Sequence, residues 1–204
     1  MSLIPLGFEC DSISALVIGG GRVGTRRALS LLESGARVRL IAPAISAELE
    51  AESLKSDRLT LERREYLGAE DIGDAMLIVA ATAKPSVNER VALDAHSATR
   101  AVNVADAPEK GSFVFLAAHR AGPVTIGVGA GGVPNAAGRI RDSIAERIDA
   151  RYARAIADCG EIRQRVLAES GSDGWKAVAA DLIDERFCES VEQGTFAERA
   201  AKWR

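Results

Sequence analysis

The stretch SALVIGGGRVGTRRALSLLESGARVRLIAP, residues 14–43, decides the fold. It begins with an apolar run at residues 15–18, which ends in the glycine-rich turn GGGRVG at residues 19–24. A segment of helical character follows as far as Ser34, and a second apolar run occupies residues 38–41. The order strand, glycine-rich turn, helix, strand is typical of the first βαβ unit of a parallel, doubly wound sheet.

The glycines of residues 19–24 have different tasks in such a turn. Gly19 permits the tight turn, Gly21 lets a pyrophosphate approach the backbone, and Gly24 lets the helix pack closely on the strand. The N–H groups at the start of the helix would then face the anion. The spacing G-x-G-x-x-G alone is a weak signal, but in this strand–turn–helix setting it predicts a dinucleotide site. The alternative is a tight turn that binds no ligand.

The choice between NAD and NADP stays open from the spacing. The second apolar run ends at residues 40–43, LIAP, without the acidic residue that usually holds a ribose 2′-hydroxyl. Arg22, Arg26 and Arg27 gather at the start of the first helix. These arginines could favour a 2′-phosphate, or they could simply be solvated.

Composition argues against several classes of protein. The 204 residues carry a net charge of −3, which disfavours a partner such as nucleic acid or a membrane surface. No apolar stretch approaches the ~20 residues of a membrane span, and the start lacks the pattern of a signal peptide. Cys10, Cys159 and Cys188 are few and widely spaced, so we expect a reducing cytoplasm. Because His96 and His119 also lack metal-ligating neighbours in sequence, no resident metal is expected.

Three parts are expected along the chain, at residues 1–112, 113–147 and 148–204. The first part alternates strands and helices, which predicts an α/β fold with a Rossmann-type parallel sheet. Beyond the first βαβ unit, the apolar pattern predicts strands at 59–61, 75–81 and 101–105 and helices at 46–54 and 85–96.

The second and third parts have a different character. Two apolar strands are expected at residues 113–117 and 124–128, joined by HRAGP at residues 119–123. Asn135 is expected to cap a helix that follows. The remainder reads as helices with breaks at four glycines, namely Gly160, Gly171, Gly174 and Gly194.

Ligand chemistry in such a sheet lies at the carboxyl ends of the strands, near the point where the strand order switches. Residues 19–24, 80–82 and 103–108 are expected to meet there. Asp106 follows a strand and could act on a ligand, or it could cap local N–H groups as a turn residue. Asn103 could likewise orient a ligand or only satisfy the backbone.

Short motifs occur along the chain in a fixed order. They are IPL at residues 4–6, GGGRV at 19–23, GARV at 35–38, AAT at 80–82, NERV at 88–91, NVADAP at 103–108, and Gly131-Gly132 followed by Arg139. Together these motifs resemble the precorrin-2 dehydrogenase family, which includes the N-terminal half of siroheme synthase. The register of the resemblance runs from residue 4 to about residue 147 without large gaps.

The resemblance implies a homodimer with a Rossmann domain, a small dimerisation segment and a helical C-terminal domain. It implies an NAD-dependent oxidoreductase that converts precorrin-2 to sirohydrochlorin, and in some members a ferrochelatase as well. Asp106 would be the catalytic residue. The cofactor-binding residues would be Gly19, Gly20, Gly21, Arg22, Val23, Gly24, Pro43, Ala44, Thr82 and Asn103. The tetrapyrrole substrate has many carboxylates, and its expected contacts are Lys110, Arg120, Gly131, Gly132 and Arg139. Each of the basic residues could instead be a plain surface charge.

One segment departs from the family's pattern. Residues 129–135, GAGGVPN, lack the usual hydroxyl at Ala130, and residues 113–116 lack the usual proline. Both changes fall in the expected substrate region and leave the cofactor turn intact. Two alternatives therefore stay open: a tetrapyrrole chelatase whose dehydrogenase step has decayed, and a non-catalytic dinucleotide-binding module that senses redox state.

Overall fold

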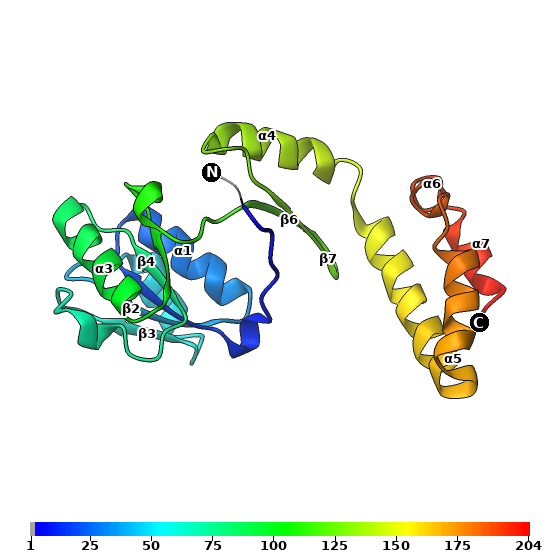
Figure 1. Cartoon of the computed structure of the whole chain (residues 1–204), viewed down its shortest axis with the longest axis horizontal. Helices are drawn as coiled ribbons and strands as arrows, with labels where there is room; N and C mark the ends of the chain where they lie inside the picture. Colours follow the sequence, from blue (N-terminus) through cyan, green and yellow to red (C-terminus); the bar gives the residue numbers. More distant parts are fainter. Residues whose placement is uncertain (1–2) are drawn as a thin grey trace. The chain divides into compact units, whose positions relative to one another are not determined.

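The computed structural model describes residues 3–204, which contacts divide into two compact units (Figure 1). The sheet unit comprises Leu6–Phe115. The hairpin–helix unit comprises Leu116–Arg204 together with the start of the chain. The finer division into three parts at residues 112 and 147 stays a prediction.

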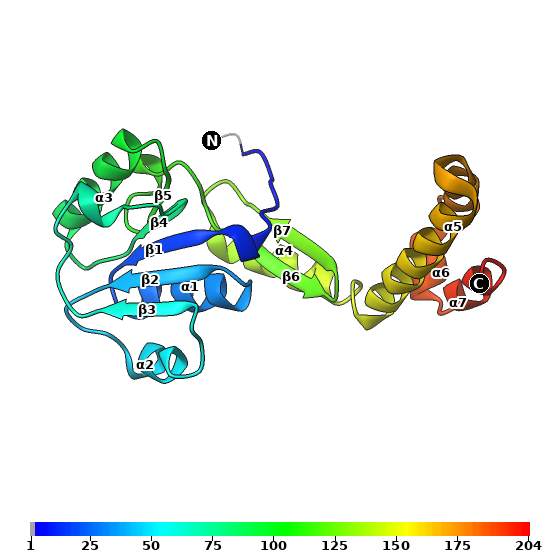
Figure 2. The same cartoon turned by 90° about the horizontal axis from the view of Figure 1, so that it is seen from below.

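The sheet unit contains a five-stranded parallel sheet with the strand order β3-β2-β1-β4-β5 (Figure 2). This confirms the expected α/β fold and places the strand at residues 59–61 on the sheet edge. The strands are β1 (Ser14–Ile18), β2 (Arg37–Ile41), β3 (Leu59–Glu62), β4 (Leu77–Ala80) and β5 (Ala101–Val104). The helices are α1 (Arg22–Glu33), α2 (Ala47–Ser53) and α3 (Pro85–Ser97), with 3-10 turns η1 (Cys10–Ser12), η2 (Ala69–Asp71) and η3 (Pro108–Lys110).

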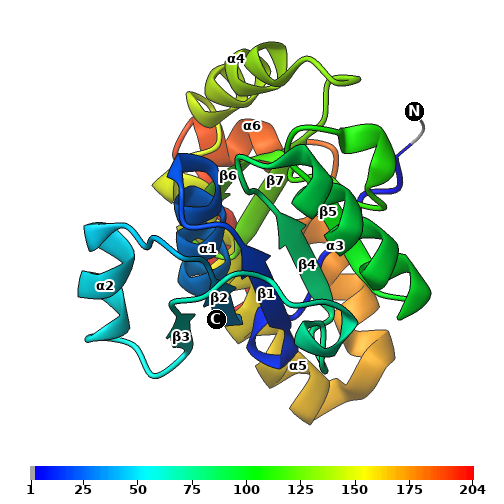
Figure 3. The same ribbon diagram turned by 90° about the vertical axis from the view of Figure 1, so that its left-hand side faces the viewer.

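The central strands are buried on both faces, as their continuous apolar sequences require. Successive side chains alternate between the faces of the sheet. One core lies between the sheet and α1 and includes Val17 and Ala28. The other lies between the sheet and α3 and includes Leu16 and Val91. Helices α1 and α3 therefore cover opposite faces of the sheet (Figure 3).

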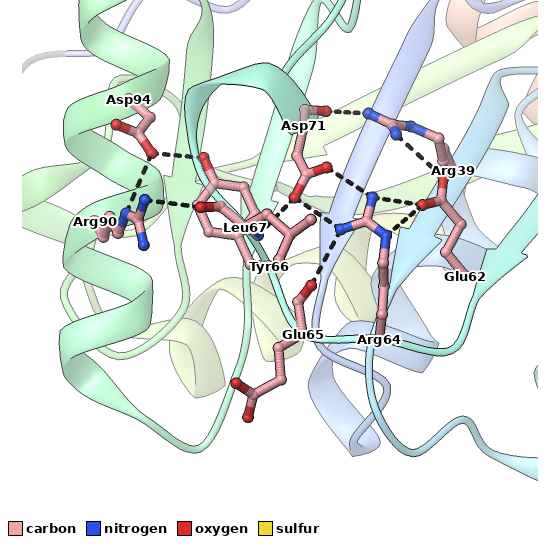
Figure 4. Close-up of polar contacts among 9 residues, drawn as sticks. All are labelled: Arg39, Glu62, Arg64, Glu65, Tyr66, Leu67, Asp71, Arg90 and Asp94. Carbon is pink, nitrogen blue, oxygen red and sulfur yellow. Dashed lines mark hydrogen bonds and ion pairs between the residues drawn. The ribbon is translucent and has the colours of Figure 1, made fainter.

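Polar contacts attach the edge strand β3 to η2 (Figure 4). The Arg64 guanidinium donates to both carboxylate oxygens of Asp71, at 2.6 and 2.9 Å, and to Oε2 of Glu62 at 2.9 Å. Arg39 of β2 donates to Oε1 of Glu62 at 3.1 Å and also to the carbonyl oxygen of Asp71. The hydrogen bonds from Arg64 hold the pKa of the Asp71 carboxyl below its usual value.

A second contact in the same region attaches the segment after β3 to α3 (Figure 4). The Tyr66 hydroxyl donates to Oδ2 of Asp94 at 2.8 Å. Burial, followed by this hydrogen bond, raises the pKa of the Tyr66 phenol. Arg90 donates to the carbonyl oxygen of Leu67 at 2.8 Å, so α3 holds this segment at two points.

The hairpin–helix unit begins with an antiparallel pair, β6 (Ala117–Ala121) and β7 (Val124–Val128). Four helices follow: α4 (Pro134–Ala145), α5 (Ala150–Leu182), α6 (Phe187–Glu192) and α7 (Phe196–Ala201). At Gly171, φ is +67°, and this break divides α5 into two arms. Ile162 of the first arm and Leu182 of the second share one apolar core with Phe196 of α7.

The strand predicted at residues 113–117 is wrong, because the strand begins at Ala117 and continues to Ala121. Phe113 and Phe115 instead pack their rings on the core under α1, with ring centroids 5.3 Å apart. The predicted connection at residues 119–123 is therefore too long. The turn consists of Gly122 and Pro123, and the φ of +58° at Gly122 explains the glycine.

Two predictions about the helices also need correction. Asn135 does not cap α4, because the capping residue is Val133 and the helix starts at Pro134, a favourable first position for proline. Gly160 and Gly174 do not break α5, which continues through both. The breaks at Gly171 and after α6, at Gly194, are confirmed, since both glycines have positive φ.

Candidate functional site

The carboxyl ends of three neighbouring strands meet at one edge of the sheet. The order places β1 between β2 and β4, which is the switch point of this topology. The Gly19 N–H donates to Ile41 O at 3.0 Å, and the Ala81 N–H donates to Ile18 O at 2.8 Å. The Ala105 N–H donates to Ala80 O at 2.9 Å. The predicted meeting of the segments after β1, β4 and β5 is therefore confirmed.

Two glycines of the turn after β1 are required by close packing. Gly19 has a φ of +118°, and a Cβ there would lie 2.4 Å from the carbonyl oxygen of Ala81. A Cβ on Gly24 would lie 1.9 Å from the carbonyl oxygen of Gly19. Any side chain at either position would collide with backbone. These contacts bring α1 close to the strand, as the spacing predicts.

The other two glycines face different surroundings. A Cβ on Gly20 would lie 2.2 Å from the carbonyl oxygen of Ala44, so the segment after β2 closes on this side of the turn. A Cβ on Gly21 would meet no atom within 4 Å. Gly21 also caps α1 without any side-chain hydrogen bond. The turn therefore leaves open space at a helix N-terminus, which fits a dinucleotide pyrophosphate.

A groove of about 500 Å³ lies between α1 and α2, beside the glycine turn. The hydroxyl groups of Thr25 and Ser46 lie 3.0 Å apart in it, one from each helix. Exposed Arg22 starts α1 and lines the groove, whereas the side chain of Val23 packs on the core. The other lining residues are Arg26, Leu29, Ser30, Glu33 and Glu48. Pro43 and Ala44 are exposed in the segment between β2 and α2.

Asp106 is exposed just after β5, and its Oδ1 accepts a hydrogen bond from Nδ2 of Asn88 at 2.8 Å. Asn88 lies on α3 and is 1% exposed. Its Oδ1 accepts from the N–H of Thr82 at 2.9 Å, and its Nδ2 donates to the carbonyl oxygen of Thr82 at 3.1 Å. Asn88 therefore connects the segments that follow β4 and β5. The sequence alone assigns this residue no role, although it opens the NERV segment of the resemblance.

The side chain of Asn103 satisfies a backbone group, which is the second of the two roles expected for it. Its Nδ2 donates to the carbonyl oxygen of Phe113 at 3.1 Å, and the residue is 8% exposed. The amide therefore holds the backbone that returns past the end of β5. A contact between Asn103 and the cofactor stays a prediction.

Lys110 is paired within the sheet unit. Its Nζ lies 2.6 Å from Oε1 of Glu89 on α3, and this hydrogen bond raises the pKa of Lys110. Nε2 of His96, also on α3, lies 3.0 Å from the carbonyl oxygen of Lys110. Together with the Asn88 contact, these interactions hold the segment from Asp106 to Lys110 against α3.

The other expected substrate contacts belong to the hairpin–helix unit, so a rim shared with Asp106 stays a prediction. Arg120 lies on β6, and Arg139 is exposed on α4. Gly131 and Gly132 have φ values of +54° and +89° in a turn that the Val133 N–H closes on Ala130 O at 2.8 Å. Both glycines face open space.

Residues 3–204 hold no group of three histidine, cysteine, aspartate or glutamate side chains that could bind a metal ion. None of the helices described there has the length and apolar character needed to cross a lipid bilayer. Cys10, Cys159 and Cys188 are free thiols.

Comparisons with known proteins show what this chain is similar to. Siroheme synthase from Saccharophagus degradans is 32% identical over 202 residues, which cover 98% of this chain and 42% of that protein. Siroheme synthase from Ectopseudomonas mendocina is 35% identical over 201 residues, which cover 97% of this chain and 40% of that protein. The chain thus spans about two fifths of the length of these relatives.

A solved structure described as SirC, precorrin-2 dehydrogenase, matches 98% of this chain and all of its own length, with a TM-score of 0.75 and 25% identity. The resemblance inferred from the motifs is therefore confirmed. A family model, NAD_binding_7, described as NAD(P)-binding, matches residues 6–117. Because this match covers more than half of the chain and includes the whole glycine turn, the protein belongs to this NAD(P)-binding family.

Proposed function

We propose that this protein is an NAD-dependent dehydrogenase that oxidises precorrin-2 to sirohydrochlorin in siroheme biosynthesis. The observation that carries the proposal is the meeting of the open glycine turn and Asp106 at one edge of the sheet. The likeness to SirC over the full length of both chains supports it. The similarity to siroheme synthases supports the same pathway, for the part of those proteins that this chain matches.

The residues of the turn fit the cofactor. The backbone of residues 19–24 would hold the pyrophosphate, with Gly21 at the point of closest approach. The groove between α1 and α2 suits the adenosine end, with Arg22 at its border and Pro43 and Ala44 in the segment that leads to α2. Thr82 and Asn103 would border the nicotinamide end. Bound NAD supplies the acceptor for a hydride.

The reaction balances without another reagent. Precorrin-2 and NAD⁺ give sirohydrochlorin, NADH and one proton, so two electrons leave the macrocycle with a hydride. Loss of the hydride leaves positive charge on the ring and makes its remaining hydrogens more acidic. The carboxylate of Asp106 stabilises this charge and accepts the proton. Lys110, Arg120, Gly131, Gly132 and Arg139 are proposed to border the acidic substrate.

Two further statements belong to the proposal. We expect a homodimer, because the two-stranded sheet of β6 and β7 has no additional strand among the described residues. We also expect a cytoplasmic protein, since three free cysteines at wide spacing are typical of a reducing compartment.

The test is anaerobic incubation of the protein with precorrin-2 and NAD. Formation of sirohydrochlorin and NADH in equal amounts, followed by absorbance, is the expected result. Cofactor binding without any turnover would overturn the proposal and favour the redox-sensing alternative. Ferrous or cobaltous ion is then added to sirohydrochlorin, and metal insertion without a dehydrogenase step would favour the chelatase alternative.

A further inference from the structure

We propose that Asn88 is a positioning residue, which orients the carboxylate of Asp106 and couples it to the backbone at the cofactor end of β4. This inference rests on the proposed function, because it assigns a role in the same reaction. Asn88 touches neither substrate nor reacting atoms in this scheme. It acts through the two residues that its amide group holds.

The hydrogen bonds of Asn88 engage both the oxygen and the nitrogen of its side-chain amide. Oδ1 accepts from the N–H of Thr82 at 2.9 Å and lies 2.8 Å from the Thr82 hydroxyl. Nδ2 has two hydrogens, one for the carbonyl oxygen of Thr82 at 3.1 Å and one for Oδ1 of Asp106 at 2.8 Å. Both hydrogens of the amide are therefore engaged, and its oxygen accepts from the backbone of Thr82.

These partners also decide which way the amide faces. The backbone N–H of Thr82 can only donate, so the Asn88 atom beside it must be the oxygen. The nitrogen then faces the carbonyl oxygen of Thr82 and the carboxylate of Asp106. A flipped amide would place two donors together at Thr82 and two acceptors together at Asp106. The side chain therefore has one favourable orientation, and burial at 1% exposure restricts it further.

The hydrogen bond from Asn88 fixes the direction in which the Asp106 carboxylate points. The residue is exposed and lies after the end of β5, where an unsupported side chain would sample several rotamers. The contact to Asn88 holds Oδ1 and leaves Oδ2 for the substrate. Misplacement of a reacting group by about 1 Å can lower the rate roughly 10²-fold. Fixing the Asp106 carboxylate should therefore contribute more to the rate of reaction than the strength of one hydrogen bond suggests.

The fold of the surrounding segment does not depend on Asn88 alone. Lys110 is paired with Glu89 at 2.6 Å, and its carbonyl oxygen lies 3.0 Å from Nε2 of His96. Both partners are on α3, as Asn88 is. Loss of the Asn88 contact should therefore change the direction of the Asp106 side chain and leave the segment seated on the helix.

The decisive variant is Asn88→Asp. An aspartate keeps an acceptor for the N–H and hydroxyl of Thr82, but as a carboxylate it cannot donate to Asp106. We expect kcat for precorrin-2 oxidation to fall roughly 10- to 100-fold, with the KM for precorrin-2 and the calorimetric Kd for NAD nearly unchanged. The control is Asp94→Ala, which removes a different contact of α3, the one to Tyr66, and should lower Tm without lowering kcat.

A double-mutant cycle separates positioning from general damage. In the Asp106→Asn background, adding Asn88→Asp should reduce turnover little further, because the group that Asn88 positions is already gone. The double variant also exchanges donor and acceptor, since the new amide at position 106 can donate to the new carboxylate at position 88. We therefore expect its Tm to exceed that of Asn88→Asp alone. Additive losses of turnover in the cycle would show a merely structural role and overturn the inference.

Two other outcomes are distinguishable. Full turnover by Asn88→Asp, beside a wild-type protein that oxidises precorrin-2, would overturn the role of Asn88 and leave the proposed function standing. A wild-type protein that binds NAD but does not oxidise precorrin-2 would overturn both. If Asn88→Asp did not fold alone, the double variant is compared with Asp106→Asn, and a further large loss of turnover would contradict the inference.

Discussion

The hydroxyl groups of Thr25 and Ser46 lie 3.0 Å apart and connect the first turn of α1 to the cap of α2. Thr25 is buried behind the glycine turn, and its hydroxyl also donates to the carbonyl oxygen of Gly20 at 3.3 Å. Ser46 accepts from the N–H of Leu49 at 3.4 Å. This pair therefore attaches the wall of the groove to the turn proposed to hold the pyrophosphate.

Replacing Ser46 with alanine should weaken both the cap and the groove. Loss of the cap of α2 should lower the free energy of unfolding by about 1 kcal/mol. Urea titration measures this change, and calorimetry should show weaker NAD binding in the same variant. Ser53→Ala, which removes a hydroxyl at the other end of α2, is the control and should leave NAD affinity unaltered. Equal NAD affinity in both variants would contradict a role for the groove.

Gly21→Val should abolish NAD binding and leave the fold intact. Its Cβ would meet no protein atom within 4 Å, and the φ of −77° is accessible to valine. The new side chain would instead occupy the space proposed for the pyrophosphate. Calorimetry measures the loss of NAD binding, and the Tm shows whether the fold is intact. Gly24→Val makes a useful contrast, since its Cβ would lie 1.9 Å from Gly19 O and should destabilise the protein. Unchanged NAD affinity in Gly21→Val would remove the turn from the site.

Asp106→Asn should lower precorrin-2 turnover by roughly 10²-fold or more, the range for loss of an acid–base group. The substitution keeps the shape of the side chain and removes its charge. NAD affinity should barely change, because the carboxylate is not proposed to contact the pyrophosphate. Steady-state kinetics and calorimetry provide the measurements. A turn-capping role predicts the reverse, namely lower Tm with turnover near that of the wild type.

Asp71→Asn should destabilise the protein at neutral pH and much less in acid. The hydrogen bonds from Arg64 lower the pKa of folded Asp71, so their stabilisation is present above the unfolded pKa of about 4 and is lost as the pH falls through the folded value. We expect the free energy of unfolding to fall by about 2 kcal/mol at pH 7, with a smaller difference near pH 3. Urea unfolding at both pH values checks this. Exposed Asp57, substituted in the same way, should give little change at either pH.

The protein should be a homodimer at micromolar concentration. Among residues 3–204, β6 and β7 form a sheet of two strands, so each strand has an unpaired edge that a second copy of the chain can complete. Sedimentation equilibrium measures the mass directly. A monomer across the micromolar range would refute the expectation.

Much of the sheet unit could be predicted because its signals are local. The glycine turn and the apolar runs identify each strand of the parallel sheet, and Pro85 marks the start of α3. The predicted strand at residues 75–81 extends beyond β4 at both ends, and at the carboxyl end Ala81 is apolar but belongs to the turn against Gly19. Burial of the run is therefore a better guide to the core than to the ends of the strand.

The remaining features depend on contacts that a linear pattern does not contain. Phe113 and Phe115 alternate with valine as in a strand, but ring packing on the core prevails over strand pairing. Asn88 is an ordinary polar residue in a helical segment until its partners, 6 and 18 residues away, are known. The distribution of the substrate candidates over two units likewise follows from tertiary contacts.

The placement of Phe113 and Phe115 decides where the chain can be divided. Both rings cover the core under α1, and the guanidinium of Arg27 lies 4.0 Å from the centroid of the Phe115 ring. Burial, followed by the neighbouring charge of Arg26, lowers the pKa of Arg27. The ring of Phe115 therefore covers a charged group whose burial is unfavourable, as well as apolar surface. A fragment that stopped at residue 112 would expose this surface to water and tend to aggregate. A soluble nucleotide-binding fragment, or a fusion joined at this point, should therefore retain Phe115.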